Sequence, residues 1–225
     1  MSRPPEQPYP SWRKAAVTLF LFAVLAAVTI GAIVRGDRLL IRPTARAAAE
    51  AAPPAFAGAS PNRVFLRPVE GREAARRGLI PAGTRSILAT GGKLDHGEWR
   101  WDDKAVPAGR IAVRVDLERQ LVSVFQGADE IGTAVIVYGV EGKETPRGKL
   151  PILGKTRDHR SLTYDAPMPF SLWLRDDGVA LHGSSVSMGK ATNGCIGVPV
   201  EFAEKLFEVA REGDIVEVIG GSAGA

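Results

Sequence analysis

The chain has 225 residues, enough for one or two domains, and its 45% hydrophobic and 24% charged residues are ordinary for globular proteins. The formal net charge is +4 at pH 7, and part of the excess lies in Lys and Arg residues before residue 50. No later cluster of Lys and Arg with interleaved aromatic residues follows in the sequence. We therefore expect no nucleic acid among the partners.

The N-terminal region contains an apolar stretch, AAVTLFLFAVLAAVTIGAIV at residues 15–34, without a charged residue or a proline. About 20 residues at roughly 1.5 Å per residue cross a hydrocarbon core of about 30 Å. A cleaved signal peptide is the alternative, because TARAAAE contains an A-x-A-like cleavage pattern. The apolar region of a signal peptide is usually shorter than this stretch, however. A buried core helix is disfavoured because the stretch is apolar on all sides. We expect a tail at 1–14, a transmembrane helix at 15–34 and an exported remainder.

Two regions without a strong periodic pattern follow the apolar stretch. Residues 35–62 are rich in Ala and Pro and are expected to be a linker. Residues 63–107 predict a small accessory or cap region with a short strand, a short polar helix and a Gly-bounded hairpin. Trp99 and Trp101 alternate with Arg100 and so share one face of a strand. They are suited either to binding sugar rings or to a hydrophobic cap over the next domain, and we expect the cap.

Residues 108–220 predict a mostly β domain of the α+β class. Alternating or continuous apolar runs predict strands, separated by turns rich in Gly and Pro, within residues 111–115, 121–125, 130–140, 144–153, 170–174, 178–183 and 215–219. Residues 200–211 predict a helix, because Ala203, Leu206, Phe207 and Ala210 fall at helical spacing, and Gly213 is a suitable stop.

Cys195 is the only cysteine of the chain, so it cannot form an intramolecular disulfide. It suits a small buried hydrophobic residue, one half of an intermolecular disulfide, or a nucleophile. A nucleophilic cysteine needs a base and donors for an oxyanion, and His182 is a candidate base. Gly183 and Gly194 permit close backbone approach by a substrate. The backbone N–H groups of Gly194 and Cys195 are candidates for an oxyanion hole.

Several motifs in one order carry a resemblance to a known family. Thr145 to Pro199 contains TPRG, APMPF, the strand end LHG and the turn TNGC. Over residues 111–219 the chain is similar to the L,D-transpeptidase (YkuD-type) catalytic domain. The resemblance implies a curved β-sheet or sandwich with one or two packed helices, preceded here by the transmembrane helix.

The resemblance also implies an activity. In this family the cysteine is the nucleophile and the histidine of the HG strand end is its base, which correspond to Cys195 and His182. The implied reaction forms a thioester on a peptidoglycan stem peptide, for cell-wall cross-linking or remodelling, in the periplasm beside the inner (cytoplasmic) membrane. Carbapenems acylate enzymes of this family. No metal or other cofactor is implied. The expected substrate-binding residues are Gly183, Asn193, Phe170, His159 and Tyr164.

The chain departs from the family pattern at three positions. Gly197 stands where an arginine associated with a substrate carboxylate usually follows the cysteine, and Lys190 or Arg175 are candidate replacement cations. Asn193 stands where many members have histidine, and Phe170 where many have tyrosine. The glycine at position 197 is the main support for one alternative, a weakened domain that binds peptidoglycan. A related thiol amidase or carboxypeptidase is a further alternative.

The two histidines outside the HG strand end are not expected to take part in catalysis. His159 lies in a polar stretch, and exposure to water is the favoured interpretation over a place beside the substrate. His96 is expected to be structural or exposed. Trp173 is expected in the core rather than lining the cleft.

Overall fold

The structure, a computed structural model, describes residues 60–220. The predicted transmembrane helix at 15–34 and nearly all of the predicted linker lie outside the described residues, and both stay predictions. Within residues 60–220, no helix is both long and apolar enough to cross a bilayer. This part of the chain is mostly β with two helices.

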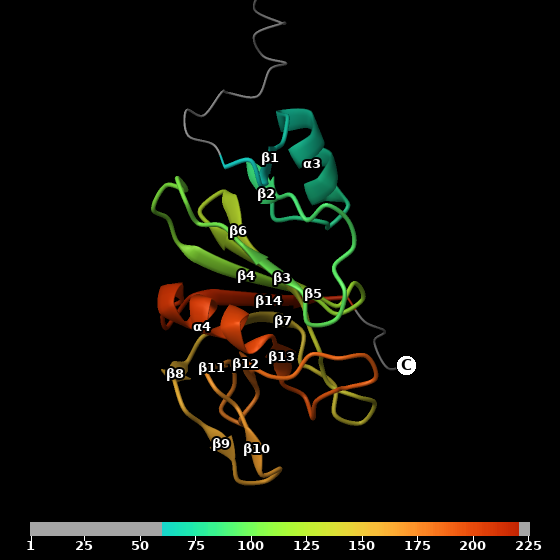
Figure 1. Ribbon diagram of the computed structural model, residues 1–225, viewed down its shortest axis with the longest axis vertical. Coiled ribbons are helices and arrows are strands. Elements are labelled where there is room, and N and C mark those ends of the chain that lie inside the picture. The colour runs from blue at the N-terminus through green and yellow to red at the C-terminus, as the bar shows by residue number, and fades with distance from the viewer. Residues whose placement is uncertain (1–59, 221–225) are drawn as a thin grey trace, which may run out of the picture. The chain divides into compact units, whose positions relative to one another are not determined.

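The described elements follow in chain order (Figure 1). The helices are α3 (Pro68–Arg76) and α4 (Val200–Val209). The strands are β1 (Arg63–Phe65), β2 (Ser86–Leu88), β3 (Trp99–Trp101), β4 (Ile111–Asp116), β5 (Leu121–Gln126), β6 (Asp129–Val135), β7 (Gly148–Pro151), β8 (Gly154–Thr156), β9 (Arg160–Ser161), β10 (Ala166–Pro167), β11 (Ser171–Trp173), β12 (Ala180–Gly183), β13 (Ile196–Val198) and β14 (Ile215–Ile219).

Two sheets make up the framework. The large sheet has eight strands, in the order β1-β2-β6-β5-β4-β14-β7, with β3 paired to β6 as well. The smaller sheet has the order β13-β12-β11-β8, and β9 pairs with β10 in a separate hairpin. Strands β4, β5 and β6 pair antiparallel because short turns join them, as their alternating apolar residues predict. The last strand, β14, lies parallel to β4.

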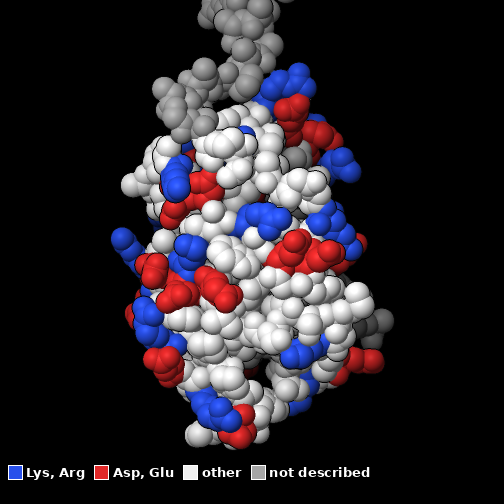
Figure 2. All heavy atoms as spheres, in the orientation of Figure 1, with Lys and Arg blue, Asp and Glu red and all other residues white. Residues whose placement is uncertain are grey.

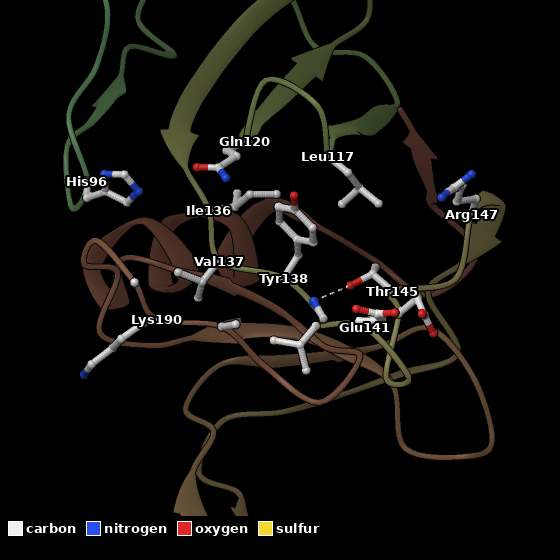
Figure 3. A pocket seen from close by; sticks show the side chains of 15 residues that line it. His96, Leu117, Gln120, Ile136, Val137, Tyr138, Glu141, Thr145, Arg147 and Lys190 are labelled. Atoms are coloured by element: carbon white, nitrogen blue, oxygen red, sulfur yellow. Dashed lines mark hydrogen bonds between the residues drawn. The ribbon is translucent and has the colours of Figure 1, made fainter. Parts of the chain in front are cut away.

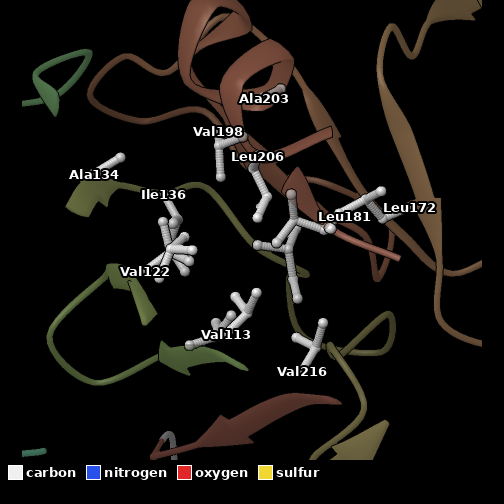
Figure 4. Packing of buried hydrophobic residues seen from close by; sticks show 14 of the residues in the cluster. Val113, Val122, Ala134, Ile136, Leu172, Leu181, Val198, Ala203, Leu206 and Val216 are labelled. Carbon is white, nitrogen blue, oxygen red and sulfur yellow. The ribbon is translucent and has the colours of Figure 1, made fainter. Parts of the chain in front are cut away.

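The hydrophobic core lies between the large sheet, the smaller sheet and helix α4 (Figure 4). Val113 and Val122 come from the large sheet, Leu181 and Val198 from the smaller sheet, and Leu206 from α4, and all are at most 2% exposed. The smaller sheet and α4 therefore share one apolar interior. This packing fixes the position of β12 and β13, including the face of these two strands that points away from the core.

The predicted helix at 200–211 is confirmed as α4, which ends at Val209. Its buried residues Phe202, Ala203 and Leu206 form one face of the helix. Gly213 follows with a φ of 83°, a left-handed conformation that glycine adopts without steric cost.

The predicted hairpin around the two tryptophans is wrong. Strand β3 pairs antiparallel with β6, with Trp99 opposite Ala134 and Trp101 opposite Gly132. No local pattern shows this pairing, because the partner lies more than thirty residues away in the chain. The prediction of a hydrophobic role is confirmed, since both indole rings pack edge-on against Phe202, at centroid distances of 6.3 and 5.5 Å.

Buried polar contacts attach the residues before β4 to the large sheet. The guanidinium of Arg63 donates to the carbonyl oxygens of Glu130 and Asp102, each at 2.6 Å. Arg85 pairs with the buried carboxylate of Asp129. Burying these charged groups is tolerable because each finds a hydrogen-bond partner. Strands β1, β2 and β3 are therefore part of the same sheet as the domain that follows.

Candidate active site

The parallel pairing of β12 with β13 brings the two predicted catalytic residues to one face of the smaller sheet. Leu181 pairs with Ile196, and His182 pairs with Gly197. Side chains alternate along a strand, so Leu181 and Ile196 enter the core while His182 points to the other face. Cys195 immediately precedes β13 and shares the face of Gly197. His182 and Cys195 thus lie on adjacent strands and on the same face.

The imidazole of His182 is held in one orientation. Its Nδ1 lies 2.9 Å from the carbonyl oxygen of Gly183, which can only accept a hydrogen bond. Nδ1 therefore carries the proton, and Nε2 keeps a lone pair. The residue is only 7% exposed, and burial lowers the pKa of His182; the bond to Gly183 opposes this effect and His159 adds to it. A neutral imidazole with a free Nε2 is suited to accept a proton at neutral pH.

The thiol of Cys195 is protonated at rest. Its Sγ donates to the carbonyl oxygen of Gly178 at 3.7 Å, and in the part of the chain that the structure describes no hydrogen bond joins it to His182. Burial raises the pKa of the Cys195 thiol, the backbone N–H of Ala180 opposes that effect, and the charge of Asp177 adds to it. Transfer of the thiol proton to His182 therefore requires the Sγ to turn away from Gly178.

The turn before Cys195 presents two backbone donors. Gly194 has a φ of 106°, a conformation that favours glycine. The hydroxyl of Thr192 donates to the carbonyl oxygen of Cys195 at 2.5 Å, and the Thr192 N–H donates to the backbone carbonyl oxygen of Tyr138 at 2.9 Å. These two hydrogen bonds hold the turn in place. Among residues 60–220, the backbone N–H groups of Gly194 and Cys195 donate to no other protein group. Both are available to a developing oxyanion.

The hairpin of β9 and β10 carries two of the predicted substrate-binding residues. His159, just before β9, is half-buried, and its ring packs edge-on against Trp173 at a centroid distance of 4.8 Å. His159 is therefore partly shielded from water by Trp173, and its place beside the substrate stays a prediction. Tyr164, in the hairpin turn, is 49% exposed. This hairpin is close enough to the site for His159 to act electrostatically on His182.

The other three predicted substrate-binding residues, Phe170, Gly183 and Asn193, have different surroundings. Phe170 packs against Phe207 of α4 at a centroid distance of 5.8 Å, so its ring faces the helix. Gly183 does permit a close approach, but Pro169 makes it: a Cβ on Gly183 would lie 3.1 Å from Pro169 Cγ. Pro169 therefore occupies the space that a side chain at position 183 would need, and the role of Gly183 in substrate binding stays a prediction. Asn193 is exposed beside Gly194.

The position of the missing arginine has no room for a side chain. A Cβ on Gly197 would lie 2.7 Å from Val137 Cγ2 and 2.9 Å from Ser184 Cβ. Of the two candidate replacement cations, one is already paired with a carboxylate and the other lines a separate pocket. Arg175 pairs with Asp177 at 2.8 Å, and Lys190 lies in the wall of a separate pocket.

That pocket has a volume of about 740 Å³ and lies between the β4–β5 turn, the segment after β6 and the loop before Cys195 (Figure 3). Its lining includes His96, Gln120, Tyr138, Glu141 and Lys190, and neither Cys195 nor His182 belongs to it. The sequence did not reveal this pocket, because its walls come from distant segments. In the described residues no group of three or more His, Cys, Asp or Glu side chains could hold a metal ion.

The charges of the described surface are mixed. On the face that Figure 2 shows, Lys and Arg side chains are interspersed with Asp and Glu, and basic residues do not form a continuous stripe. Ion pairs such as Arg157 with Glu204, at 3.6 Å, account for part of this mixing.

A comparison with protein families assigns the catalytic region of the chain to a family. A sequence profile of YkuD, the L,D-transpeptidase catalytic domain, matches residues 110–218, and this part of the chain belongs to the YkuD L,D-transpeptidase catalytic domain family. The search of curated proteins found no match.

Similar solved structures include three L,D-transpeptidases. The one from Stackebrandtia nassauensis is 24% identical, with 55% of this chain and 63% of that chain covered and a TM-score of 0.47. The one from Mycobacterium smegmatis is 17% identical, with 49% and 58% covered and a TM-score of 0.45. A variant from Enterococcus faecium is 22% identical, with 50% of each chain covered and a TM-score of 0.45. The chain thus spans less than two thirds of the length of these proteins.

Proposed function

We propose that this chain is a cysteine-dependent L,D-transpeptidase that acts on the stem peptides of peptidoglycan. One observation carries the proposal. In a domain of this family, the register of β12 and β13 places the neutral imidazole of His182 on the same face as Cys195. The two free N–H groups at Gly194 and Cys195 supply the donors that acyl transfer requires.

The reaction follows from these groups. His182 Nε2 takes the proton of the Cys195 thiol, and the thiolate attacks the carbonyl carbon of the third residue of a tetrapeptide stem. A C–S bond forms, and the C–N bond to the terminal D-alanine breaks. The proton on His182 passes to the departing amine, so D-alanine leaves and a thioester remains. An amine of a second stem then attacks the thioester, which restores the thiol and forms the cross-link.

The proposal includes the place of action. The apolar stretch at 15–34 would anchor the chain in the inner membrane, and the Ala/Pro-rich segment would hold the domain among periplasmic stem peptides. The support is the sequence pattern together with the chemistry of a substrate found outside the cytoplasmic membrane.

A second candidate function is binding of peptidoglycan without turnover. One observation favours it: at rest, the Cys195 thiol donates to Gly178 rather than to His182, and burial raises its pKa. A thiol that never ionises would bind stems and leave them intact.

The test separates the two candidates. Purified full chain, as wild type and as Cys195→Ala, is incubated with imipenem, a carbapenem found in complex with one of the similar L,D-transpeptidases. Intact mass should show one adduct on the wild type and none on the variant. A folded wild type with a reduced thiol and no adduct would contradict the catalytic proposal and favour binding alone.

A further inference from the structure

A stem peptide brings a negative charge close to the reacting carbonyl. The leaving D-alanine ends in a carboxylate one residue beyond the bond that breaks, and a cation near Cys195 would bind it by a charge-assisted hydrogen bond. Gly197 cannot supply that cation, because a Cβ there would overlap Val137 and Ser184. Arg175 is neutralised by Asp177, and Lys190 lies in the lining of the separate pocket.

Lys143 lies beside the turn that carries the nucleophile. It belongs to the loop between β6 and β7, which folds tightly because the Gly139 N–H donates to Thr145 Oγ1 at 3.0 Å. The carbonyl oxygens of Lys143 and Glu144 each lie 3.7 Å from the point where a Cβ on Gly194 would stand. The backbone of Lys143 is therefore in contact distance of the residue before Cys195.

The side chain of Lys143 leaves this loop toward the β9–β10 hairpin. Its Nζ donates to the hydroxyl oxygen of Tyr164 at 3.3 Å and lies 6.0 Å from the centre of that ring. Glu141 and Glu144, on the same loop, line the separate pocket, and Lys143 does not. The side chain of Lys143 thus runs from the loop beside Gly194 to the hairpin turn that carries Tyr164.

The charge of Lys143 is not balanced by a carboxylate. Within residues 60–220 its polar contact is the neutral hydroxyl of Tyr164, and no ion pair includes it. Arg175, by contrast, holds Asp177 at 2.8 Å. An ammonium whose partner is a neutral hydroxyl can accept an anionic ligand without first losing an ion pair.

We propose that Lys143 Nζ, together with the Tyr164 hydroxyl, binds the terminal carboxylate of the leaving D-alanine and takes over the function of the missing arginine. Both groups are hydrogen-bond donors, and the backbone of Lys143 lies beside Gly194, the residue before Cys195. The inference rests on the proposed function for its ligand, a peptide with a free C-terminal carboxylate. It predicts that such peptides are preferred to the same peptides ending in an amide.

The test compares two peptides on matched variants of the full chain. The peptides are a stem tetrapeptide with a free C-terminal carboxylate and its C-terminal amide. Lys143→Met should lower kcat/KM for the acid by about tenfold, mainly through KM, and leave the amide unchanged. Lys143→Arg should restore the preference, and Tyr164→Phe should lose part of it. Lys190→Met is the control, because that lysine lines the separate pocket, and it should behave as wild type.

Binding to the Cys195→Ala chain, measured by calorimetry, tests recognition without turnover. A preference for the acid that Lys143→Met removes supports the inference even if the wild type releases no D-alanine, a result that would contradict only the proposed function. Equal binding of acid and amide to the Cys195→Ala chain would overturn the inference. So would an equal loss for both peptides in Lys143→Met, which would indicate a structural role of this lysine.

Discussion

The sulfur of Cys195 lies 3.7 Å from the carbonyl oxygen of Gly178 and hydrogen-bonds to it at rest. A carbonyl oxygen accepts from the thiol but repels a thiolate. The same site offers His182 as a neutral base on the adjacent strand. The resting state is therefore a protonated thiol, and the ionised state forms only when the sulfur turns toward the imidazole.

The first prediction concerns the pH dependence of thiol reactivity. Because burial raises the pKa of the Cys195 thiol, its thiolate fraction at neutral pH is smaller than that of a free cysteine, whose pKa is about 8.5. The rate of alkylation by iodoacetamide should still be rising at pH about 8.5. Intact mass over a pH series measures it. A rate that levels off below neutral pH would indicate instead a resting thiolate–imidazolium pair.

The second prediction uses the charge of Asp177. Its carboxylate raises the pKa of Cys195, so Asp177→Asn should lower that pKa and speed alkylation severalfold at neutral pH. The variant also releases Arg175 from its ion pair, which acts in the same direction. Asp176→Asn is the matched control from the same loop and should leave the rate near that of the wild type. If both variants behave alike, the effect belongs to the loop and not to the charge beside the sulfur.

The third prediction concerns His182. Asn at this position keeps a donor for the Gly183 carbonyl but removes the proton-accepting nitrogen. His182→Asn should therefore reduce acylation of Cys195 by imipenem about 100-fold or more, with a melting temperature close to that of the wild type. Stopped-flow measurement of the acylation rate checks this. An unchanged rate in a folded variant would exclude His182 as the base.

The fourth prediction concerns space at Gly197. A Cβ there would lie 2.7 Å from Val137 Cγ2, and this overpacking should make Gly197→Ala less stable by about 1–3 kcal/mol. Gly154→Ala is the control on another strand of the same sheet, since its Cβ would have no contact closer than 3.8 Å. Urea unfolding of both variants gives the free energies. Equal stabilities would show that β13 shifts to admit a side chain, and an arginine there would then be possible.

Local patterns in the sequence were sufficient for many of the elements. Alternating apolar residues predicted β4 and β5, and the spacing of Ala203, Leu206 and Phe207 predicted α4. These predictions succeed because a half-buried strand repeats every two residues and a helix about every 3.6 residues. The pairing of β3 with β6 was missed, since strand pairing depends on hydrogen bonds between distant segments.

The residue types of the candidate site can be read directly from the chain: one cysteine, a histidine before a glycine, and glycines at a tight turn, in the order of the family. The way these residues come together depends on the folded chain. The parallel register of β12 and β13 puts His182 and Cys195 on one face, because side chains of paired strands alternate together. Folding likewise closed the space at Gly183 with Pro169, and it brought Lys143 from one loop to Tyr164 on a hairpin. Contacts between segments far apart in the chain leave no local pattern, so neither the resting partner of the sulfur nor the contact of Lys143 with Tyr164 was visible before the chain was folded.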